Sequence, residues 1–106
     1  MRLLTRAEEY VLLAVLTLGE EAYSLPILEH IEQATQKKWT LGGIYIPLYR
    51  LEEKGFLTSD LGSPTKERGG KRKRYYRVTR KGKDALNEHR EIQSAMWADV
   101  GKASLE

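Results

Sequence analysis

Apolar residues along the chain recur at helical spacing in four stretches and alternate over one short stretch. The first helix is predicted to begin after Thr5, because Thr5 and Glu8 have the spacing of a capping box, and to end at Gly19. Its segment 10–16 is apolar nearly all the way round, whereas a surface helix needs only one apolar stripe. We therefore expect this helix to be covered on two sides, by its own domain and by a second copy of the chain.

The second helix is predicted to begin at Ser24, whose hydroxyl can cap it. Pro26 then falls in the first turn, where its missing N–H costs little. Leu28 and Ile31 belong to an apolar stripe, and the lysines at 37–38 lie at the far end, where positive charge suits the helix dipole. This pattern predicts a helix with one buried face.

The third helix is predicted from about Gly42 to Lys54, with Gly55 as its stop. Thr40 or one of the two glycines must form the start of this helix. Pro47 deep inside a helix would cost about 3 kcal/mol, which favours a start as late as Gly43. One face carries the aliphatic residues Ile44, Leu48 and Leu51. The other face mixes aromatic, aliphatic and charged residues, namely Tyr45, Ile46, Tyr49, Arg50 and Glu53. Exposed aromatic residues of this kind indicate a surface that binds a partner.

A hairpin follows, with strands predicted at 56–61 and 72–79. The segments 62–64 and 69–70 supply the Gly and Pro residues that turns require. In the return strand, Tyr76 and Val78 should point to one face, and Tyr75 and Arg77 to the other. The fold class expected is thus mostly α with a small β-hairpin.

The last helix is predicted from Arg80, capped by Thr79, to about Ala103. No later element exists for it to pack against, and an isolated helix is marginal in water. We therefore expect it to form a dimer interface together with the first helix. The residues predicted for that interface are Tyr10, Leu13, Leu86, Ile92, Met96, Trp97 and Val100.

Charge is unevenly distributed along the 106 residues. The net charge is only +3, yet ten of the 18 basic residues lie between Lys66 and Lys83, where Glu67 alone opposes them. Such a patch suits a polyphosphate or an anionic membrane surface, although it is also what a solvated hairpin carries. A helix followed directly by a basic hairpin is how a winged helix-turn-helix binds DNA, with the helix in the major groove. We therefore favour DNA as the partner.

Other classes of function find little support. The absence of cysteine excludes a disulfide framework, a thiolate zinc site and a cysteine nucleophile. His30 and His89 have no partners at metal-ligand spacing, and the carboxylates at 52–53 lie on a helix face rather than forming a catalytic pair. No secretory signal is visible, and no apolar run reaches the roughly 18 residues that a membrane span needs. We expect a cytoplasmic protein, with no enzyme activity, metal or cofactor and no membrane partner.

Two linked motifs resemble the PadR family of transcriptional regulators. The first is Gly43-Ile44-Tyr45-x-x-Leu48-x-Arg50-Leu51-Glu52-x-x-Gly55-Phe56, and the second is Gly69-Gly70-Lys71-x-Lys73-x-Tyr75-Tyr76-x-Val78-Thr79-x-x-Gly82. The N-terminal segment Leu12-Leu13-Ala14-x-Leu16, followed by Ala22-Tyr23-Ser24, also resembles this family. The single last helix resembles the smaller PadR subfamily. One departure is that Ile46 separates the helix tyrosine from its proline, whereas in the family the proline commonly follows directly.

The resemblance implies a homodimeric winged helix-turn-helix repressor, often responsive to a small molecule. It implies that residues 1–79 form the DNA-binding domain and that residues 80–106 form a dimerisation helix. The third helix would contact the major groove, and the hairpin, which we call the wing, would contact the minor groove or the backbone. We expect an inverted-repeat operator, because dimer symmetry is mirrored in the DNA.

The residues predicted to contact DNA lie on the third helix and the wing. They are Gly42, Gly43, Tyr45, Tyr49, Arg50, Lys66, Arg68, Lys71, Lys73 and Arg74. A tyrosine hydroxyl can bind a phosphate or a base edge, and an arginine can bind guanine or clamp a phosphate. The glycines would let backbone amides approach phosphate. Lysine and arginine at the wing tip suit a narrow minor groove, and those nearer its return strand suit phosphates.

Less specific interpretations stay open for these residues. Tyr45 can pack beneath the wing, Arg50 can pair with Glu53 or Glu29, and the two glycines can simply form a turn. Trp97 is favoured as a core residue of the dimer interface. The resemblance also allows it to line a pore for flat aromatic ligands at the dimer centre.

Two alternative functions follow from these interpretations. One is a multidrug sensor that binds a small aromatic effector at the dimer interface. The other is a protein-interaction module on a winged-helix fold, whose basic hairpin contacts an acidic protein instead of DNA.

Overall fold

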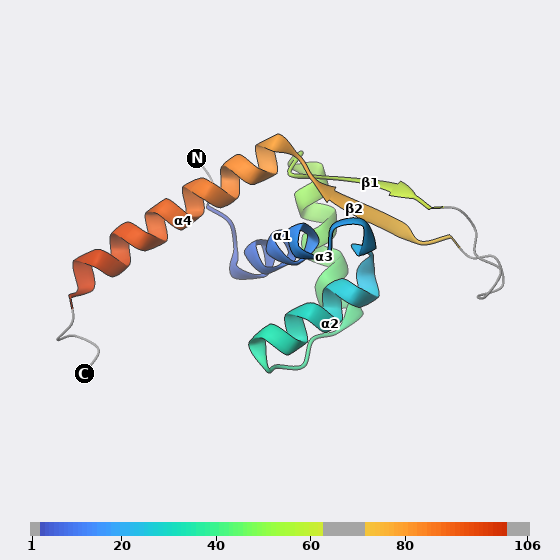
Figure 1. Cartoon of the computed structure of the whole chain (residues 1–106), viewed down its shortest axis with the longest axis horizontal. Coiled ribbons are helices and arrows are strands. Elements are labelled where there is room, and N and C mark those ends of the chain that lie inside the picture. The colour runs from blue at the N-terminus through green and yellow to red at the C-terminus, as the bar shows by residue number, and fades with distance from the viewer. Residues whose placement is uncertain (1–2, 63–71, 102–106) are drawn as a thin grey trace.

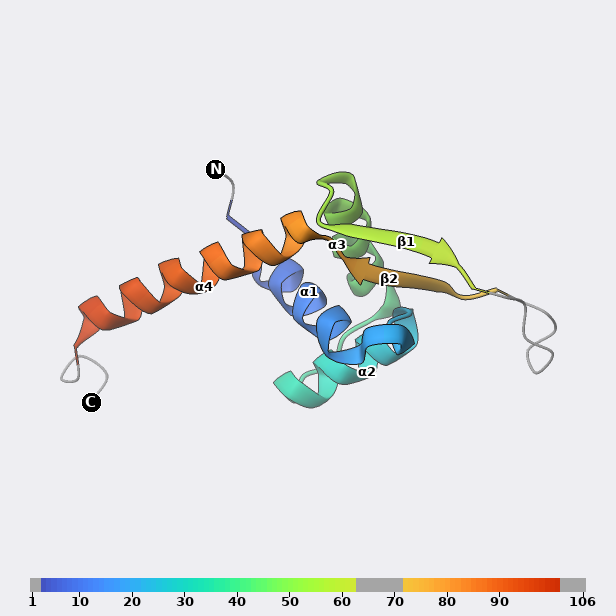
Figure 2. The same ribbon diagram turned by 45° about the horizontal axis from the view of Figure 1, so that its top comes forward.

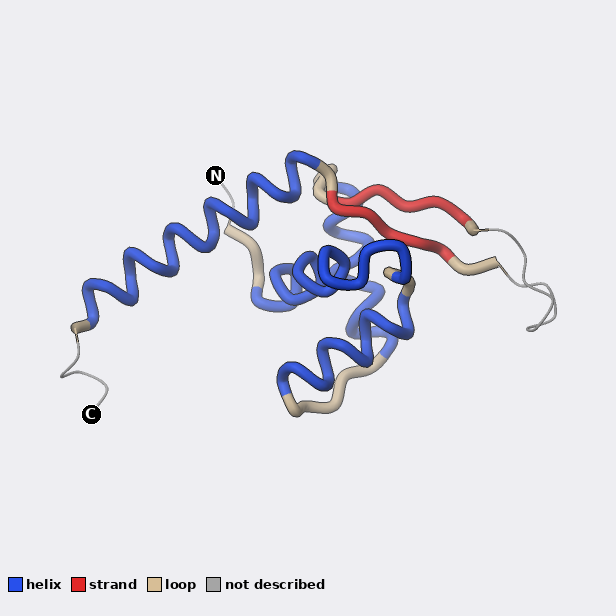
Figure 3. Tube along the Cα trace, viewed as in Figure 1, coloured by secondary structure: helices blue, strands red, loops and turns tan. Residues whose placement is uncertain are grey.

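The computed structural model describes residues 3–62 and 72–101. Four helices and one hairpin follow one another along the chain (Figure 1). They are α1 (Arg6–Leu18), the 3₁₀ turn η1 (Gly19–Glu21), α2 (Ser24–Thr35), α3 (Leu41–Glu53), β1 (Leu57–Leu61), β2 (Arg74–Val78) and α4 (Arg80–Val100). Figure 3 shows the hairpin strands in red and the helices in blue, joined by short loops in tan. The predicted fold class, a winged helix-turn-helix with a long last helix, is confirmed.

Local sequence signals account for both ends of α1. The Thr5 hydroxyl accepts a hydrogen bond from the Glu8 amide at 3.1 Å, and the Glu8 carboxylate accepts one from the Thr5 amide at 2.9 Å. This is the predicted capping box, and it satisfies two amides that a helix start leaves unpaired. At the other end, Gly19 has a φ of 59°, which few residues other than glycine adopt readily.

The core lies where α1, α2 and α3 pack on one another, with the base of the wing closing one side. The predicted inner face of α3 is confirmed, since Ile44, Leu48 and Leu51 are all buried. The hairpin contributes Leu57 and Tyr76 to the same core. On α1 the outward side stays open, and its leucines Leu13 and Leu16 are nearly half exposed. The side that was expected to face a second copy is therefore uncovered within a single chain.

One predicted cap and one predicted helix start were wrong. α2 begins at Ser24 as predicted, but the N-cap residue is Tyr23, without a side-chain cap, and the Ser24 hydroxyl accepts a hydrogen bond from the Tyr45 hydroxyl. α3 begins at Leu41, earlier than expected, because the Thr40 hydroxyl caps it. Pro47 therefore lies well inside the helix, where its ring is buried. Core burial of that ring helps to offset the hydrogen bond that a proline cannot donate.

The wing is a two-stranded antiparallel sheet in which Leu57 pairs with Val78 and Leu61 with Arg74. Both strands are shorter than predicted. The Tyr76 amide also donates to the carbonyl of Ala22 at 2.8 Å, which attaches the wing to the turn before α2. The tip, at residues 63–71, lies outside the described residues.

α4 leaves the body at the base of the wing and runs away from it (Figures 1 and 2). The Thr79 hydroxyl caps it by accepting from the Gly82 amide at 3.0 Å, as predicted. Gly82 is buried, and a Cβ there would lie 2.3 Å from the carbonyl oxygen of Phe56, so only glycine fits. The helix ends at Val100, sooner than the predicted Ala103, because Gly101 adopts a φ of 75°. Helix α4 and the wing project from opposite ends of the body, and the molecule with both measures 57 × 29 × 20 Å.

Candidate nucleic-acid interface

The outer face of α3 is exposed and rich in aromatic residues. Tyr45, Ile46 and Tyr49 are 49%, 57% and 65% exposed, although all three have large apolar surfaces. They face away from the core because Ile44, Leu48 and Leu51 occupy the opposite side of the helix. The helix thus presents a surface that its own chain leaves uncovered.

Both tyrosine hydroxyls on this face have polar partners. Tyr45 donates to the hydroxyl of Ser24, and Tyr49 donates to the carboxylate of Glu53, each at 3.1 Å. The hydrogen bond and the negative charge of Glu53 raise the pKa of Tyr49, so that hydroxyl stays protonated near neutral pH and can donate. Tyr45 is half exposed rather than packed beneath the wing.

The Arg50 side chain is free to bind a ligand, whereas one of the two glycine amides already has a hydrogen-bond partner. The Arg50 side chain is exposed and makes no ion pair with any residue in 3–62 or 72–101, so the proposed pairs with Glu53 and Glu29 do not form. Gly42 and Gly43 occupy the first turn of α3 and are exposed. The Gly43 amide already donates to the Thr40 hydroxyl at 2.9 Å, which leaves it less free to meet a phosphate.

Of the wing residues predicted to contact DNA, Lys73 and Arg74 lie within the described residues, and their surroundings differ. Lys73 extends its ammonium over the ring of Tyr23, 4.3 Å from the centroid, and donates to the Tyr23 hydroxyl at 3.2 Å. Arg74 donates to the hydroxyl of Ser59 at 2.9 Å, and Ser59 in turn donates to Glu52. The remaining predicted wing contacts, Lys66, Arg68 and Lys71, lie outside the described residues.

A groove of about 800 Å³ separates the α3 face from the outer end of the wing strands, at Leu61 and residues 72–74. Its lining brings together Tyr23, Ser24, Tyr45, Tyr49, Lys73 and Arg74, from three different elements. Four of these are among the predicted DNA contacts, whereas Tyr23 and Ser24 are not. The groove combines hydroxyl donors with positive charge, a combination that suits a phosphate backbone.

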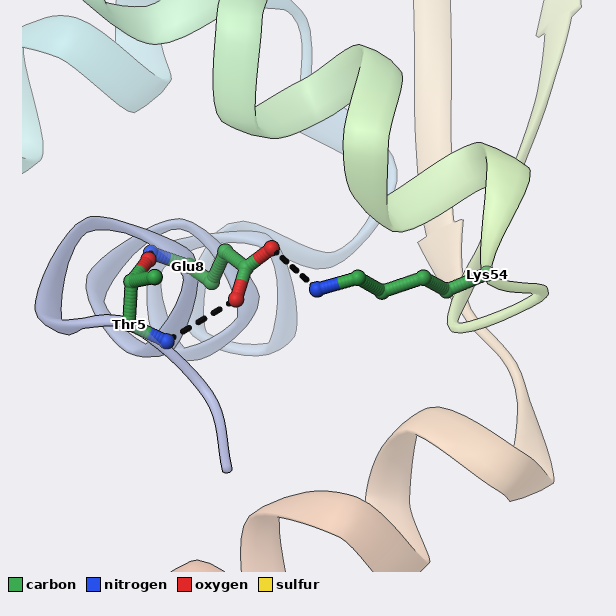
Figure 4. Close-up of polar contacts among 3 residues, drawn as sticks. All are labelled: Thr5, Glu8 and Lys54. Carbon is green, nitrogen blue, oxygen red and sulfur yellow. Dashed lines mark hydrogen bonds and ion pairs between the residues drawn. The ribbon is translucent and has the colours of Figure 1, made fainter. Parts of the chain in front are cut away.

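An ion pair that the sequence patterns did not predict fixes the end of α3. The Lys54 ammonium lies 2.6 Å from a carboxylate oxygen of Glu8, whose side chain is 1% exposed (Figure 4). Burial by itself would raise the pKa of Glu8, but the hydrogen bond and charge of Lys54 and the hydrogen bonds from Thr5 outweigh it and lower the pKa. One carboxylate therefore caps α1 and also holds the C-terminal end of α3.

The residues predicted for a dimer interface fall into two groups. Tyr10 and Leu86 pack partly against the core of their own chain, and the Tyr10 ring lies 6.1 Å from that of Trp39. The others face outwards in whole or in part, and they are Leu13, Ile92, Met96, Trp97 and Val100. Trp39 packs against the core.

His89 has a carboxylate partner, contrary to the expectation that it stands alone. Its Nε2 lies 3.5 Å from a carboxylate oxygen of Glu9, a contact between α4 and α1. Among residues 3–62 and 72–101, no group of three His, Asp or Glu side chains is placed to hold a metal ion. Within the same ranges, no helix is long and apolar enough to cross a membrane.

A family model describes this combination of α3, wing and α4. The model of the transcriptional regulator PadR-like family matches residues 12–88. The chain belongs to this family. PadR-like proteins are transcriptional regulators and not enzymes, so the prediction that the chain is not an enzyme is confirmed.

Solved structures agree with this assignment. A PadR-like transcription factor from Bacteroides fragilis is 27% identical, with a TM-score of 0.70 over 87% of this chain and 84% of that one. A PadR family regulator from Eggerthella lenta is 25% identical, with a TM-score of 0.65 over 88% and 81%. A transcriptional regulator from Clostridium thermocellum, at 21% identity, has the same fold, with a TM-score of 0.72 over 89% and 85%. No curated protein matches the chain.

Proposed function

We propose that this PadR-like regulator is a homodimeric repressor that binds an inverted-repeat operator in double-stranded DNA. The α3 face with Tyr45, Tyr49 and Arg50 contacts base edges in the major groove. Lys73 and Arg74 in the wing contact the flanking phosphates, and so do the basic residues of the wing tip. Repression, as opposed to activation, is taken from the family resemblance.

One observation supports this function above the others. An exposed, aromatic helix face and a basic hairpin lie on either side of one groove, which is lined by Tyr45 and Tyr49 on one wall and Lys73 on the other. The helix supplies hydrogen-bonding groups that can distinguish bases, and the hairpin supplies charge that phosphates attract. A groove for an acidic protein would not need the aromatic helix face.

The dimer is supported by apolar surface that one chain cannot bury. Met96 and Trp97 near the end of α4 are 66% and 63% exposed, and Leu13 on α1 is 45% exposed. Pairing these surfaces with a second copy would cover them and place two α3 helices on one DNA duplex. Two such helices must lie about one helical turn apart, roughly 34–36 Å, to enter successive major grooves.

Selection from a random pool of duplex DNA tests this function directly. A homodimer should enrich a palindromic site, and its affinity for that site should fall steeply as salt rises, because bound phosphates release counterions. Placing the site downstream of a promoter should then lower transcription when the protein is added. Salt-sensitive binding without a consensus would contradict a sequence-specific regulator and favour the protein-interaction alternative.

A second candidate function is that of a sensor for planar aromatic ligands at the dimer centre. Trp97 favours it, because its ring is largely exposed on α4 beside Met96 and is free to stack on a ligand. Saturable quenching of tryptophan fluorescence by a planar aromatic dye, absent from Trp97→Ala but retained in Trp39→Phe, would support this site. No quenching by any dye in a panel would count against it.

A further inference from the structure

Tyr23 lies where α2, the wing and the groove meet. Its neighbours in sequence each fasten one wall of the groove. The Ala22 carbonyl accepts from the Tyr76 amide of the wing at 2.8 Å, and the Ser24 hydroxyl accepts from Tyr45 of α3 at 3.1 Å. The turn at residues 22–24 therefore links the two elements that the proposed function brings to DNA.

The side chain of Tyr23 supports the wing from the groove side. Its ring meets the ring of Tyr75 edge to face, with centroids 5.5 Å apart and planes at 67°. Its face and hydroxyl both contact the Lys73 ammonium, at 4.3 Å from the centroid and 3.2 Å from the oxygen. A ring edge against one neighbour and a ring face beneath a cation is the arrangement that the aromatic quadrupole favours.

Such contacts hold the ammonium without cancelling its charge. A free lysine samples many rotamers, and fixing it on binding costs conformational entropy. Within residues 3–62 and 72–101, Lys73 has no carboxylate partner, whereas a carboxylate would neutralise it. A neutral ring holds the side chain in place and leaves the positive charge available to a phosphate.

We propose that Tyr23 is a positioning residue for DNA binding, which holds the Lys73 ammonium in the groove between α3 and the wing so that it meets a backbone phosphate. This rests on the proposed DNA-binding function. It adds a residue outside the motifs of the third helix and the wing, and it assigns to Lys73 a fixed position rather than that of a freely moving surface charge.

The test measures affinity for the selected operator and its salt dependence in Tyr23→Phe, Tyr23→Leu and Lys73→Met. Tyr23→Leu should weaken binding about tenfold, and Tyr23→Phe about threefold, since phenylalanine keeps the ring but loses the hydroxyl. Lys73→Met should weaken binding at least as much and lower the slope of log K against log salt by about 0.9. The double variant should bind no more weakly than Lys73→Met alone, because Tyr23 acts through Lys73.

Lys81→Met is the matched control. Lys81 also holds its ammonium over a ring, 5.6 Å from the centroid of Phe56, but it lies in the first turn of α4 and does not line the groove. Lys81→Met removes the same charge as Lys73→Met, and its affinity for the operator should change by less than about twofold. Thermal unfolding of each Tyr23 variant checks that a loss of binding is not a loss of fold, and Tyr23→Phe keeps the test open if leucine is not tolerated.

Two outcomes overturn the inference and differ from each other. In the first, the wild-type protein binds its operator with a steep salt slope, but Tyr23 does not position Lys73. That would follow if Tyr23→Leu binds as tightly as wild type, or if the double variant binds tenfold more weakly than Lys73→Met alone. If the wild-type protein selects no DNA at all, the proposed function fails and this inference fails with it.

Discussion

α3 and α4 are both amphipathic helices capped by a threonine, yet they bury their apolar residues very differently. In α3, Ile44, Leu48 and Leu51 are at most 1% exposed. In α4, Gly82 is the one buried residue, and the apolar side chains of the last turns, such as Met96 and Trp97, are mostly exposed. The same kind of sequence pattern is thus covered by the core of its own chain in α3 and left largely uncovered in α4.

This difference means that substitutions in the two helices should affect two different properties, the stability of the fold and the association of copies. The position of α3 is determined by the core of its own chain, so changes that loosen it should lower the free energy of unfolding. The outer part of α4 makes few contacts with that core, so changes there should alter association and leave the fold of the body intact. Stability that depends on a second copy also depends on protein concentration.

Breaking the ion pair at the end of α3 should have the largest effect. Lys54→Met leaves the Glu8 carboxylate buried without its cation, which costs about 3 kcal/mol of unfolding free energy at pH 7. Urea unfolding measures it, with the exposed Lys38→Met as a control that should change stability by less than about 0.5 kcal/mol. Equal stability of Lys54→Met and wild type would mean that α3 does not depend on this pair.

The pH dependence of that variant sharpens the same test. Folding lowers the pKa of Glu8 below its usual 4.5, so the pair contributes fully above about pH 4.5 and loses its contribution as the pH falls through the folded-state value. Without Lys54, burial would instead favour the neutral carboxyl. The stability difference between the two proteins should therefore shrink as the pH falls from 7 to below 4.5, and a constant difference would contradict this account.

Gly82→Ala should have the next largest effect, because it acts where α4 joins the body. The added Cβ would lie 2.3 Å from the Phe56 carbonyl oxygen and 2.9 Å from a methyl of Val78. Relief of this overlap must shift α4 from the wing, at a cost of about 2 kcal/mol. Gly42→Ala is the control, since its Cβ would be 3.9 Å from the nearest atom and alanine is the better helix former. Thermal unfolding should show the first variant destabilised and the second unchanged or slightly stabilised.

Charge placed on the outer part of α4 should change assembly alone. Met96→Glu puts a carboxylate into the proposed dimer interface and should raise the dimer dissociation constant at least tenfold, or about 1.4 kcal/mol. Ala98→Glu adds the same charge on the other side of the helix and should leave dimerisation unchanged. Sedimentation equilibrium distinguishes them. A wild-type protein that stays monomeric at all concentrations would show that α4 has another partner.

Sequence patterns predicted the helix ends that are determined by residues close together in the sequence. The capping box at Thr5, the cap at Thr79 and the stop at Gly55, whose φ is 80°, all depend on groups a few positions apart. The start of α3 was misplaced because a general cost for Pro47 was weighed without knowing that its ring would be buried. The cost was judged locally, whereas the compensation comes from the core.

Contacts between distant residues were not predicted by any pattern. The pair of Glu8 and Lys54 joins positions 46 apart, and the contact of Tyr23 with Lys73 joins positions 50 apart. Both depend on how α1, α3 and the wing pack together in the folded chain. Family motifs identified the helix face and the wing as contact surfaces. The turn that links them also resembles the family, at Ala22-Tyr23-Ser24, but that resemblance gave Tyr23 no role.

The smallest expected effect distinguishes the two walls of the groove. Tyr49→Ala should lower the preference for the selected operator over a scrambled duplex by about fivefold, because it removes a donor that can bind a base edge. Lys73→Ala should weaken binding to both duplexes equally, because phosphates are the same in each. When Tyr49 binds a base it has to break only its hydrogen bond to Glu53, because its side chain is otherwise exposed. Competition titrations with the two duplexes measure both quantities, and a change of base preference in Lys73→Ala would reverse the roles assigned to helix and wing.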